Sequence, residues 1–384
     1  MPRSLLADGA SLLIVAVSGR ALAASARRAG FVPLVADFFA DTDTRQIAHC
    51  YCKLDDLKGG FQWKALAPAL EALAEAAPAP LLGVVYGAGF EDRTALLAKI
   101  AERWPLIGNG PSAVARVKAP EMFFAELARL GIPHPRTVMD PAAAESGWLA
   151  KRQGGAGGSH IVGNRAAVRH KAVGRLYFQE KVVGRPVSVL FAGTETSARV
   201  LGFSEQWAAP TPRSKWRYGG AAQPAELSRG LKARLIDNVE LVGQRLGLKG
   251  LGSADFLVDG EDSYLLEINP RPGATLDIFD SETTPLLRIH AEAVLHNRLP
   301  TAPLNLPAAT ASAIVYATEP ITVSQAMIWP DWTADRPESG ERIDKERPIC
   351  TVWARSRTKV EARHLVEKRI SFILAACAGR EGGS

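Results

Sequence analysis

The first third of the chain alternates apolar runs with helix-forming segments. The run LLIVAV at 12–17 leads through a polar loop at 18–20 into ALAASARRAG, and then into a second apolar run, FVPLVADFF. A strand, a helix and a strand in this order predict a β-α-β unit of a parallel sheet. A further strand, LLGVVYGAG, ends in the glycine-containing loop 87–91. Residues 1–112 are therefore predicted to form an open α/β domain.

This predicted domain lacks the glycine fingerprint of dinucleotide-binding sheets. Only Gly19 occupies the first turn, whereas the fingerprint needs several glycines for the tight turn, the pyrophosphate and the helix packing. A nicotinamide-dependent dehydrogenase is therefore disfavoured. Open α/β sheets bind their ligands at the strand ends, which makes the loops 18–20 and 87–91 candidates for holding a second substrate.

A glycine-rich stretch follows a later predicted strand. In WLAKRQGGAGG, Lys151 stands at the strand end, directly before Gly154, Gly155, Gly157 and Gly158. Glycines let backbone N–H groups come close to phosphate oxygens, and a nearby lysine adds positive charge. A P-loop has its lysine after the glycines, so the order here predicts a flexible glycine flap over phosphates. A plain surface loop would explain the glycines but not the position of the lysine.

Two predicted strands near residue 260 place carboxylates opposite each other. SADFLVDGEDSYLLEIN is typical of a hairpin, and a turn centred on Glu261 pairs Asp255 with Glu267. Regular alternation puts Leu265, Glu267 and Asn269 on one face. Facing carboxylates repel unless a cation lies between them, and this set of oxygen ligands suits Mg²⁺. A solvated sheet edge is the alternative, and the residue types alone leave both interpretations open.

The composition is that of a globular protein with a sizeable core. The 384 residues are 47% hydrophobic, which allows about two or three domains. Lys and Arg number 46 against 40 Asp and Glu, but they are scattered and no aromatic residues interleave with them. Phosphate-bearing small molecules are therefore expected as partners, and nucleic acid is not. No apolar run approaches the ~20 residues of a membrane helix and no signal-peptide layout is present, so we expect a cytoplasmic protein without a membrane segment.

The order of these features resembles the ATP-grasp superfamily. Lys118, Lys151 with GGAGG, QEKVVG, Asp255 and LEINPRPG follow one another, and the match covers nearly the whole chain. The resemblance implies an ATP-grasp fold, α/β and α+β in class, preceded by a Rossmann-like domain. The implied parts are an N-terminal α/β domain at 1–112, a small subdomain with the glycine loop at 113–185, a large subdomain with the magnesium site at 186–300, and a C-terminal α/β segment at 301–384 that packs on the body.

The resemblance also implies cofactors and roles for individual residues. The cofactors are ATP and Mg²⁺, with Mn²⁺ as an alternative ion. The implied nucleotide contacts are Lys118, Lys151, Gly154, Gly155, Gly157, Gly158, Glu180 and Val182, of which the last two form the adenine hinge. The implied metal ligands are Asp255, Glu267 and Asn269. Arg271 and Lys151 are the implied catalytic residues, with the guanidinium of Arg271 meeting the transferred phosphoryl group or the substrate carboxylate. Pro186 departs from the family, since many relatives have a glutamate there for the ribose hydroxyls.

The segments SGRALAASARRAG, GAGFED and RYGGAAQP are most similar to small carboxylate–amine ligases, including those that join tyramine and glutamate in methanofuran-type cofactor synthesis. Such an enzyme uses ATP to convert a carboxylate, glutamate being the first candidate, into an acyl phosphate that an amine attacks. Arg213, Lys215, Arg217 and Tyr218 are candidates for holding the acid, with solvated loop cations as the alternative. A bicarbonate-activating carboxylase and a non-catalytic ATP sensor are the rival functions, and a homodimer is compatible with the resemblance.

Overall fold

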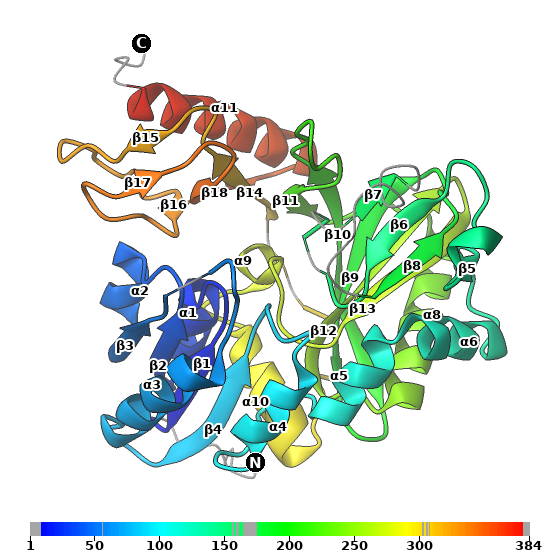
Figure 1. Ribbon diagram of the computed structural model, residues 1–384, viewed down its shortest axis with the longest axis horizontal. Helices are drawn as coiled ribbons and strands as arrows, with labels where there is room; N and C mark the ends of the chain where they lie inside the picture. Colours follow the sequence, from blue (N-terminus) through cyan, green and yellow to red (C-terminus); the bar gives the residue numbers. More distant parts are fainter. Residues whose placement is uncertain are drawn as a thin grey trace.

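The computed structural model describes residues 9–55, 57–155, 157–158, 161–163, 175–301, 303–304, 306 and 308–378. In this part of the chain the strands form a parallel sheet near the N-terminus, a small antiparallel sheet, a large eight-stranded antiparallel sheet and a two-stranded ribbon. Figure 1 shows the N-terminal sheet in blue beside the C-terminal segment in orange and red, with the green strands of the two antiparallel sheets to the right.

The N-terminal sheet has the predicted β-α-β arrangement. Its strands run in the order β3 (Cys50–Lys53), β2 (Val32–Asp37), β1 (Ser11–Val15) and β4 (Leu81–Tyr86), all parallel. Its helices are α1 (Arg20–Arg28), α2 (Thr42–Ile47), α3 (Trp63–Glu75) and α4 (Thr94–Ala101). Leu12 and Ile14 belong to the core around α1, whereas Leu13 and Val15 belong to the core around α3 and α4. Because both faces of β1 are covered, the strand is continuously apolar from Leu12 to Val15.

The small sheet follows two short helices. These helices are α5 (Pro111–Lys118) and α6 (Pro120–Arg129), and a single 3₁₀ turn, η1 (Pro141–Ala143), lies further along the chain. The sheet runs in the order β5 (Thr137–Val138), β8 (Leu176–Gln179), β6 (Leu149–Arg152) and β7 (Ile161–Gly163). Its described core is small, consisting of Trp148, Ala150 and Phe178 with their neighbours.

The large sheet contains strands from two distant parts of the sequence. Its order is β13 (Asp262–Asn269), β12 (Gly250–Asp259), β9 (Arg185–Gly193), β10 (Ala198–Ala208), β11 (Tyr218–Gln223), β14 (Ala309–Tyr316), β18 (Pro348–Ser356) and β16 (Thr333–Ala334). The ribbon of β15 (Ile321–Thr322) and β17 (Arg342–Ile343) lies beside it. The C-terminal strands thus continue the sheet that β9 to β13 begin, as Figure 1 shows.

Helices pack on both faces of the large sheet. They are α8 (Arg229–Leu246), α9 (Leu276–Phe279), α10 (Leu286–His296) and α11 (Lys359–Cys377). Val189 and Phe191 of β9 pack in the core with α8, while Leu190 packs in the core with α9, α10 and α1. On this second face of β12, apolar Leu251 is followed by Ser253 and then by Asp255. The face therefore changes from core to polar surface along the strand.

The hairpin of β12 and β13 pairs Asp255 with Glu267, as predicted, but by a different route. Its turn is one residue tighter, because Asp259 pairs with Asp262, and a β-bulge between Asp255 and Phe256 restores the predicted register. The bulge also corrects the predicted face of Leu265, which lies with Ile268 in the core under α8. Glu267 and Asn269 face the other way. Bulges commonly re-aim side chains in this manner next to functional sites.

Polar side chains fasten the N-terminal domain to the large sheet. The Nδ2 group of Asn109 donates to the carbonyls of Lys249 and Pro270, both at 2.9 Å, and its Oδ1 accepts from the Lys249 N–H at 2.8 Å. His290 of α10 accepts from the Leu251 N–H through Nδ1 at 2.9 Å, so its Nε2–H donates to the Ile107 carbonyl at 2.8 Å. Asn109 thus joins the end of the N-terminal domain to the residues just before β12 and just after β13, and His290 joins it to β12 itself.

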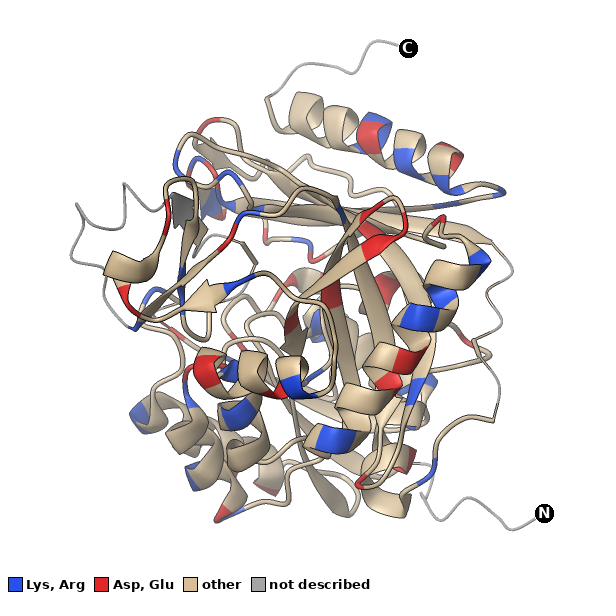
Figure 2. Ribbon diagram, turned by 90° about the vertical axis from the view of Figure 1, so that its right-hand side faces the viewer, with Lys and Arg blue, Asp and Glu red and all other residues tan. Residues whose placement is uncertain are grey.

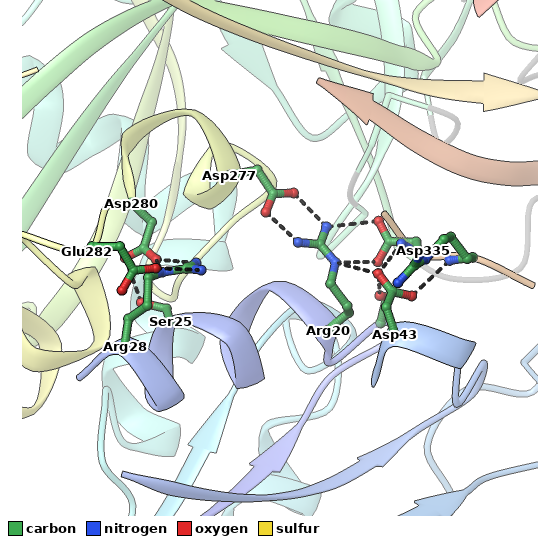
Figure 3. A network of polar contacts seen from close by, with 10 residues as sticks. Arg20, Ser25, Arg28, Asp43, Asp277, Asp280, Glu282 and Asp335 are labelled. Atoms are coloured by element: carbon green, nitrogen blue, oxygen red, sulfur yellow. Dashed lines mark hydrogen bonds and ion pairs between the residues drawn. The ribbon is translucent and has the colours of Figure 1, made fainter. Parts of the chain in front are cut away.

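A charged network joins the N-terminal domain to two further parts of the chain, as Figure 3 shows. Buried Arg20 donates from both terminal nitrogens to Asp277 of α9 at 2.5 and 2.6 Å, and to Asp335 near the C-terminal strands at 3.0 Å. Asp280 accepts from Ser25 and Arg28 of α1 at 2.7 and 2.6 Å. The predicted substrate loop 18–20 therefore takes part in interdomain contacts through Arg20.

Charges on the surface are mixed. Figure 2 shows Lys and Arg interspersed with Asp and Glu along the helices of the face in view. No helix in the described ranges has both the length and the apolar character needed to cross a bilayer.

The neutral state of buried His290 should make stability depend on pH. Burial lowers the pKa of His290 to about 4, below the ~6.5 of an unfolded histidine. Because the unfolded state binds the proton more tightly than the folded state, the free energy of unfolding is at its full value above pH ~6.5 and decreases as the pH drops towards 4. At pH 5 the loss is roughly 2 kcal/mol.

We expect the loss of melting temperature between pH 7 and pH 5 to be smaller in His290→Gln than in the wild type. The exposed residue His49 provides the control, since His49→Gln should keep the wild-type slope. Equal slopes in all three proteins would show that His290 is not the titrating group.

Candidate active site

Oxygen ligands gather on one face at the end of the β12–β13 hairpin. Asp255 accepts from the Ser188 hydroxyl of β9 at 2.6 Å and from the Asn269 amide at 3.0 Å. Glu267 lies directly across from Asp255 in the strand pairing. Strand register and the bulge thus bring the three predicted metal ligands, Asp255, Glu267 and Asn269, to one place.

The two carboxylates disturb each other electrostatically. Burial, together with the neighbouring charge of Glu267, raises the pKa of Asp255 to about 6. Such a site favours a cation, because positive charge between the carboxylates removes the repulsion. Two carboxylates and an amide oxygen, all hard donors, fit Mg²⁺ with further ligands from water and phosphate. No third carboxylate, histidine or cysteine joins them among the described residues.

Lys118 reaches the same oxygens from the end of α5. Its ammonium donates to the Asn269 Oδ1 at 2.9 Å and to Glu267 at 3.3 Å, and its side chain is buried. This lysine was predicted to contact phosphate. In the structure its positive charge lies against two of the predicted metal ligands.

Lys151 faces the site from the small sheet. Its ammonium donates to Gln179 of β8 at 2.6 Å. Burial lowers the pKa of Lys151 to about 8, with the charge of Glu267 raising it and that of Lys118 lowering it. The charges of Glu267 and Lys118 thus both act on the Lys151 ammonium, although the three residues come from different parts of the fold.

The described part of the glycine loop packs against two other segments. A Cβ on Gly154 would lie 2.7 Å from the Asp92 Cβ of the N-terminal domain, and one on Gly158 would lie 1.7 Å from the Trp216 carbonyl oxygen. The Gly157 carbonyl accepts from the Tyr218 N–H at 3.0 Å. Gly154, Gly157 and Gly158 all have positive φ, which a side chain would strain. Ala156, Ser159 and His160 lie outside the described residues, and Gly155 is buried.

The predicted adenine hinge connects the two antiparallel sheets. Glu180 follows β8, and its carboxylate accepts from the Arg136 Nε at 3.1 Å in an exposed pair. Val182 is half-buried, and Pro186 is exposed at the start of β9. The backbone from 181 to 184 has no regular structure, so its N–H and C=O groups are not committed to strand pairing.

Arg271 is paired with a residue that sequence reasoning did not select. Its Nε donates to the Glu91 carboxylate at 2.8 Å, and its Nη2 lies 2.7 Å from the same oxygen. Both side chains are almost completely buried. The GAGFED loop had been predicted to hold a second substrate, and the only signal for this pair was a glutamate in a loop at a strand end.

The four predicted substrate residues differ in their surroundings. Arg213 and Lys215 are exposed. Arg217 donates to the carbonyls of Ala209 and Glu346 at 2.9 and 3.0 Å, and its guanidinium lies 3.6 Å from the centre of the Tyr316 ring. The Tyr218 hydroxyl is buried and has no hydrogen-bond partner among the described residues. Arg217 therefore has structural partners, whereas the Tyr218 hydroxyl has no hydrogen-bond partner in the described part of the chain.

Sequence comparisons relate part of the chain to ATP-grasp proteins. Residues 122–275 match the family model of the ATP-grasp domain. The large chain of carbamoyl phosphate synthase from Myxococcus xanthus is 25% identical over 199 residues, 47% of this chain and 18% of that protein. The corresponding protein of Deinococcus radiodurans is 27% identical over 220 residues, 51% of this chain and 21% of that protein. The chain thus spans about a fifth of the length of these curated relatives.

Solved structures resemble nearly the whole chain. N5-carboxyaminoimidazole synthetase from Staphylococcus aureus, complexed with ADP, is 15% identical with a TM-score of 0.69, covering 95% of this chain and 98% of its own. L-amino acid ligase from Bacillus licheniformis is 13% identical with a TM-score of 0.71, covering 96% and 98%. Biotin carboxylase from Campylobacter jejuni is 15% identical with a TM-score of 0.71, covering 92% and 89%. At these identities the likeness concerns the fold.

The repulsion between the carboxylates predicts a variant that gains stability. Asp255→Asn removes a half-buried charge, and its amide oxygen can accept from the Asn269 amide while its NH2 group donates to the Ser188 hydroxyl, so it should raise the melting temperature by a few degrees at pH 8. Because the pKa of Asp255 is raised in the folded state, the gain should grow as the pH increases from 4 to 8. In the same variant, Mg²⁺ with ADP should stabilise the protein less than it stabilises the wild type.

Asp259→Asn is the matched control, because Asp259 is exposed on the same strand. It should change neither the melting temperature nor the response to Mg²⁺ and ADP. A lower melting temperature of Asp255→Asn at pH 8 would contradict the electrostatic explanation.

Proposed function

We propose that this chain, whose residues 122–275 match the ATP-grasp domain and whose fold is that of ATP-grasp enzymes, is an ADP-forming ligase that joins a carboxylate to an amine. The observation that carries the proposal is the meeting of the paired carboxylates Asp255 and Glu267 with the cations Lys118, Lys151 and Arg271. Phosphoryl transfer depends on positioning and on the neutralisation of charge more than on covalent help from the protein. This site offers both.

The proposed reaction has two steps, formation of an acyl phosphate and attack on it by the amine. A carboxylate oxygen of the acid attacks the terminal phosphorus of ATP, and ADP leaves with the electrons of the broken P–O bond. The amine nitrogen then attacks the acyl carbon, the C–O bond to phosphate breaks, and the nitrogen loses a proton. Lys118, Lys151 and Arg271 would balance the charge of the phosphate oxygens in both steps. Mg²⁺ on Asp255, Glu267 and Asn269 would supply further positive charge when bound.

Lys118 changes partner in this proposal. Its ammonium lies against Asn269 and Glu267, which are the oxygens that the metal would use. When a divalent ion neutralises these oxygens, the ammonium becomes available for phosphate. Lys151, with its lowered pKa, keeps its position by donating to Gln179 and would act as a second phosphate contact.

For the substrates we propose an amino acid, with glutamate first, and a primary amine. The likeness in fold to L-amino acid ligase from Bacillus licheniformis and the resemblance of the loops to small carboxylate–amine ligases support this choice. A role in one-carbon-carrier cofactor synthesis of the methanofuran type, in the cytoplasm and as a homodimer, is the finer part of the proposal. The buried hydroxyl of Tyr218 is our first candidate for a contact with the acid.

Activation of bicarbonate is the second candidate reaction. It is supported by the likeness in fold to N5-carboxyaminoimidazole synthetase and biotin carboxylase, and by the partial match to carbamoyl phosphate synthase. The same cations would then serve a carboxyphosphate. A protein that binds ATP without catalysis is the third function, and the presence of Arg271 beside Asp255, Glu267 and Asn269 speaks against a site that has lost its catalytic residues.

A panel of acids tests the proposal directly. ADP release is measured with MgATP and each amino acid, or bicarbonate, in the presence of hydroxylamine, which captures acyl phosphates as hydroxamates. A hydroxamate with one amino acid supports the ligase, whereas ADP release that depends on bicarbonate alone supports the carboxylase. Stabilisation by MgATP without ADP release from any acid would favour the sensor.

Removal of Glu267 should separate catalysis from folding. Glu267→Ala takes away one predicted metal ligand at a strand end and one neighbour of Lys118. We expect ATP consumption to fall by at least ~10³-fold, as for the loss of a group that acts only on the developing charge, while the far-UV circular dichroism spectrum stays that of the wild type.

Glu261→Ala, at the exposed turn of the same hairpin, is the control and should keep wild-type turnover. Near-normal ATP consumption by Glu267→Ala would remove Glu267 from the site.

A further inference from the structure

One loop of the N-terminal domain reaches into the proposed active site. This loop, residues 87–93 between β4 and α4, carries Glu91 to the guanidinium of Arg271, with 2.8 Å from Nε and 2.7 Å from Nη2 to the same carboxylate oxygen. The two residues are separated by 180 positions in the sequence. Both side chains are almost completely buried, so the contact is shielded from solvent.

The loop is held rigidly on its own domain. Phe90 stacks on Phe61 with ring centres 4.5 Å apart and an angle of 13° between the planes. Gly89 has a φ of +111°, and its N–H donates to the second oxygen of Glu91 at 2.8 Å. A side chain at Gly89 would clash with Phe61, since its Cβ would lie 2.7 Å from that ring. The carboxylate of Glu91 is thus fixed on one side by its own loop and on the other by Arg271.

The same loop supports the glycine loop. Asp92, the next residue, packs against Gly154, where a Cβ would approach the Asp92 Cβ to 2.7 Å. Two predicted elements of the nucleotide site, the guanidinium of Arg271 and the glycine loop, therefore contact adjacent residues of the N-terminal domain.

We propose that Glu91 is a positioning residue, which holds the guanidinium of Arg271 in the orientation needed to meet the terminal phosphoryl group of ATP. This inference rests on the proposed function, because it assumes a nucleotide at the site. A guanidinium has five N–H donors in a planar fork. A carboxylate that holds its Nε side fixes the plane and leaves donors on the terminal nitrogens for an oxyanion. The N-terminal domain thereby becomes part of the phosphoryl-transfer site.

The charge of Glu91 fits this role. Burial raises the pKa of Glu91, but the charges of Arg271 and Lys118 outweigh this and lower it to about 2. The carboxylate is therefore ionised throughout the physiological range. A purely structural alternative exists, in which Glu91 only neutralises a buried arginine, and the test must separate the two.

The test uses binding of MgATP and MgADP, so that it needs no acid or amine. Dissociation constants are measured by titration calorimetry for the wild type, Glu91→Asp, Glu91→Gln, Arg271→Gln and the double variant Glu91→Asp/Arg271→Gln. Glu91→Asp is the decisive variant, since it keeps the charge but withdraws the carboxylate by one methylene group. Positioning predicts that Glu91→Asp and Arg271→Gln each lower the preference for ATP over ADP roughly tenfold, the scale of one hydrogen bond to a charged group.

The affinity for MgADP and the melting temperature of Glu91→Asp should stay at wild-type values, and the double variant should lose no more preference than Arg271→Gln alone. Glu71→Gln is the matched control. Glu71 is also a glutamate of the N-terminal domain paired with an arginine, Arg103, but that pair is exposed, so its removal should leave both affinities unchanged.

Several results would overturn the inference. An unchanged ATP preference in Glu91→Asp, with a loss only in Glu91→Gln, would indicate neutralisation alone. Equal weakening of MgATP and MgADP would indicate a structural role, and an unchanged preference in Arg271→Gln would show that Arg271 does not meet the phosphoryl group. If the wild type binds neither nucleotide, the proposed function fails as well, and this case is recognised without any variant.

Discussion

The repulsion between Asp255 and Glu267 is the constraint on which the rest of the site depends. The pairing of β12 and β13 forces the two carboxylates together, and burial together with the charge of Glu267 raises the pKa of Asp255. Lys118 from α5 lies within hydrogen-bond distance of Glu267 and Asn269. Cations from other parts of the fold thus offset the repulsion between the carboxylates, and the remaining negative charge favours a divalent ion between them.

Each cation of the site comes from, or is held by, a different part of the fold. Lys118 ends a helix that follows the N-terminal domain, Lys151 belongs to the small sheet, and Arg271 follows β13 but is fixed by Glu91 of the N-terminal domain. Movement of one part relative to the others would therefore change the charge balance around the carboxylates. The N-terminal domain is attached to the large sheet and its helices through Asn109, His290 and the network around Arg20 (Figure 3).

The sequence predicted the local features of this site and missed the long-range ones. The pairing of Asp255 with Glu267 could be predicted because hairpin register follows from nearby residues. The bulge could not be predicted. The tighter turn shifts the register by one residue, the extra residue of the bulge shifts it back, and only the face on which Leu265 lies differs from the prediction. The contacts of Glu91 with Arg271 and of Arg20 with Asp277 join residues far apart in the chain, and no periodicity in a single sequence encodes them.

The distribution of burial explains how the fold tolerates such a site. On β12 the face that carries Asp255 begins at Leu251, in the apolar core shared with α10 and α1, while the opposite face is apolar from Ala254 to Val258 under α8. The hairpin is therefore anchored by hydrophobic packing on one side along its length, and only the end of its other side is polar. This hydrophobic packing does not depend on the charges. The free energy that it contributes therefore offsets the destabilising repulsion between the carboxylates.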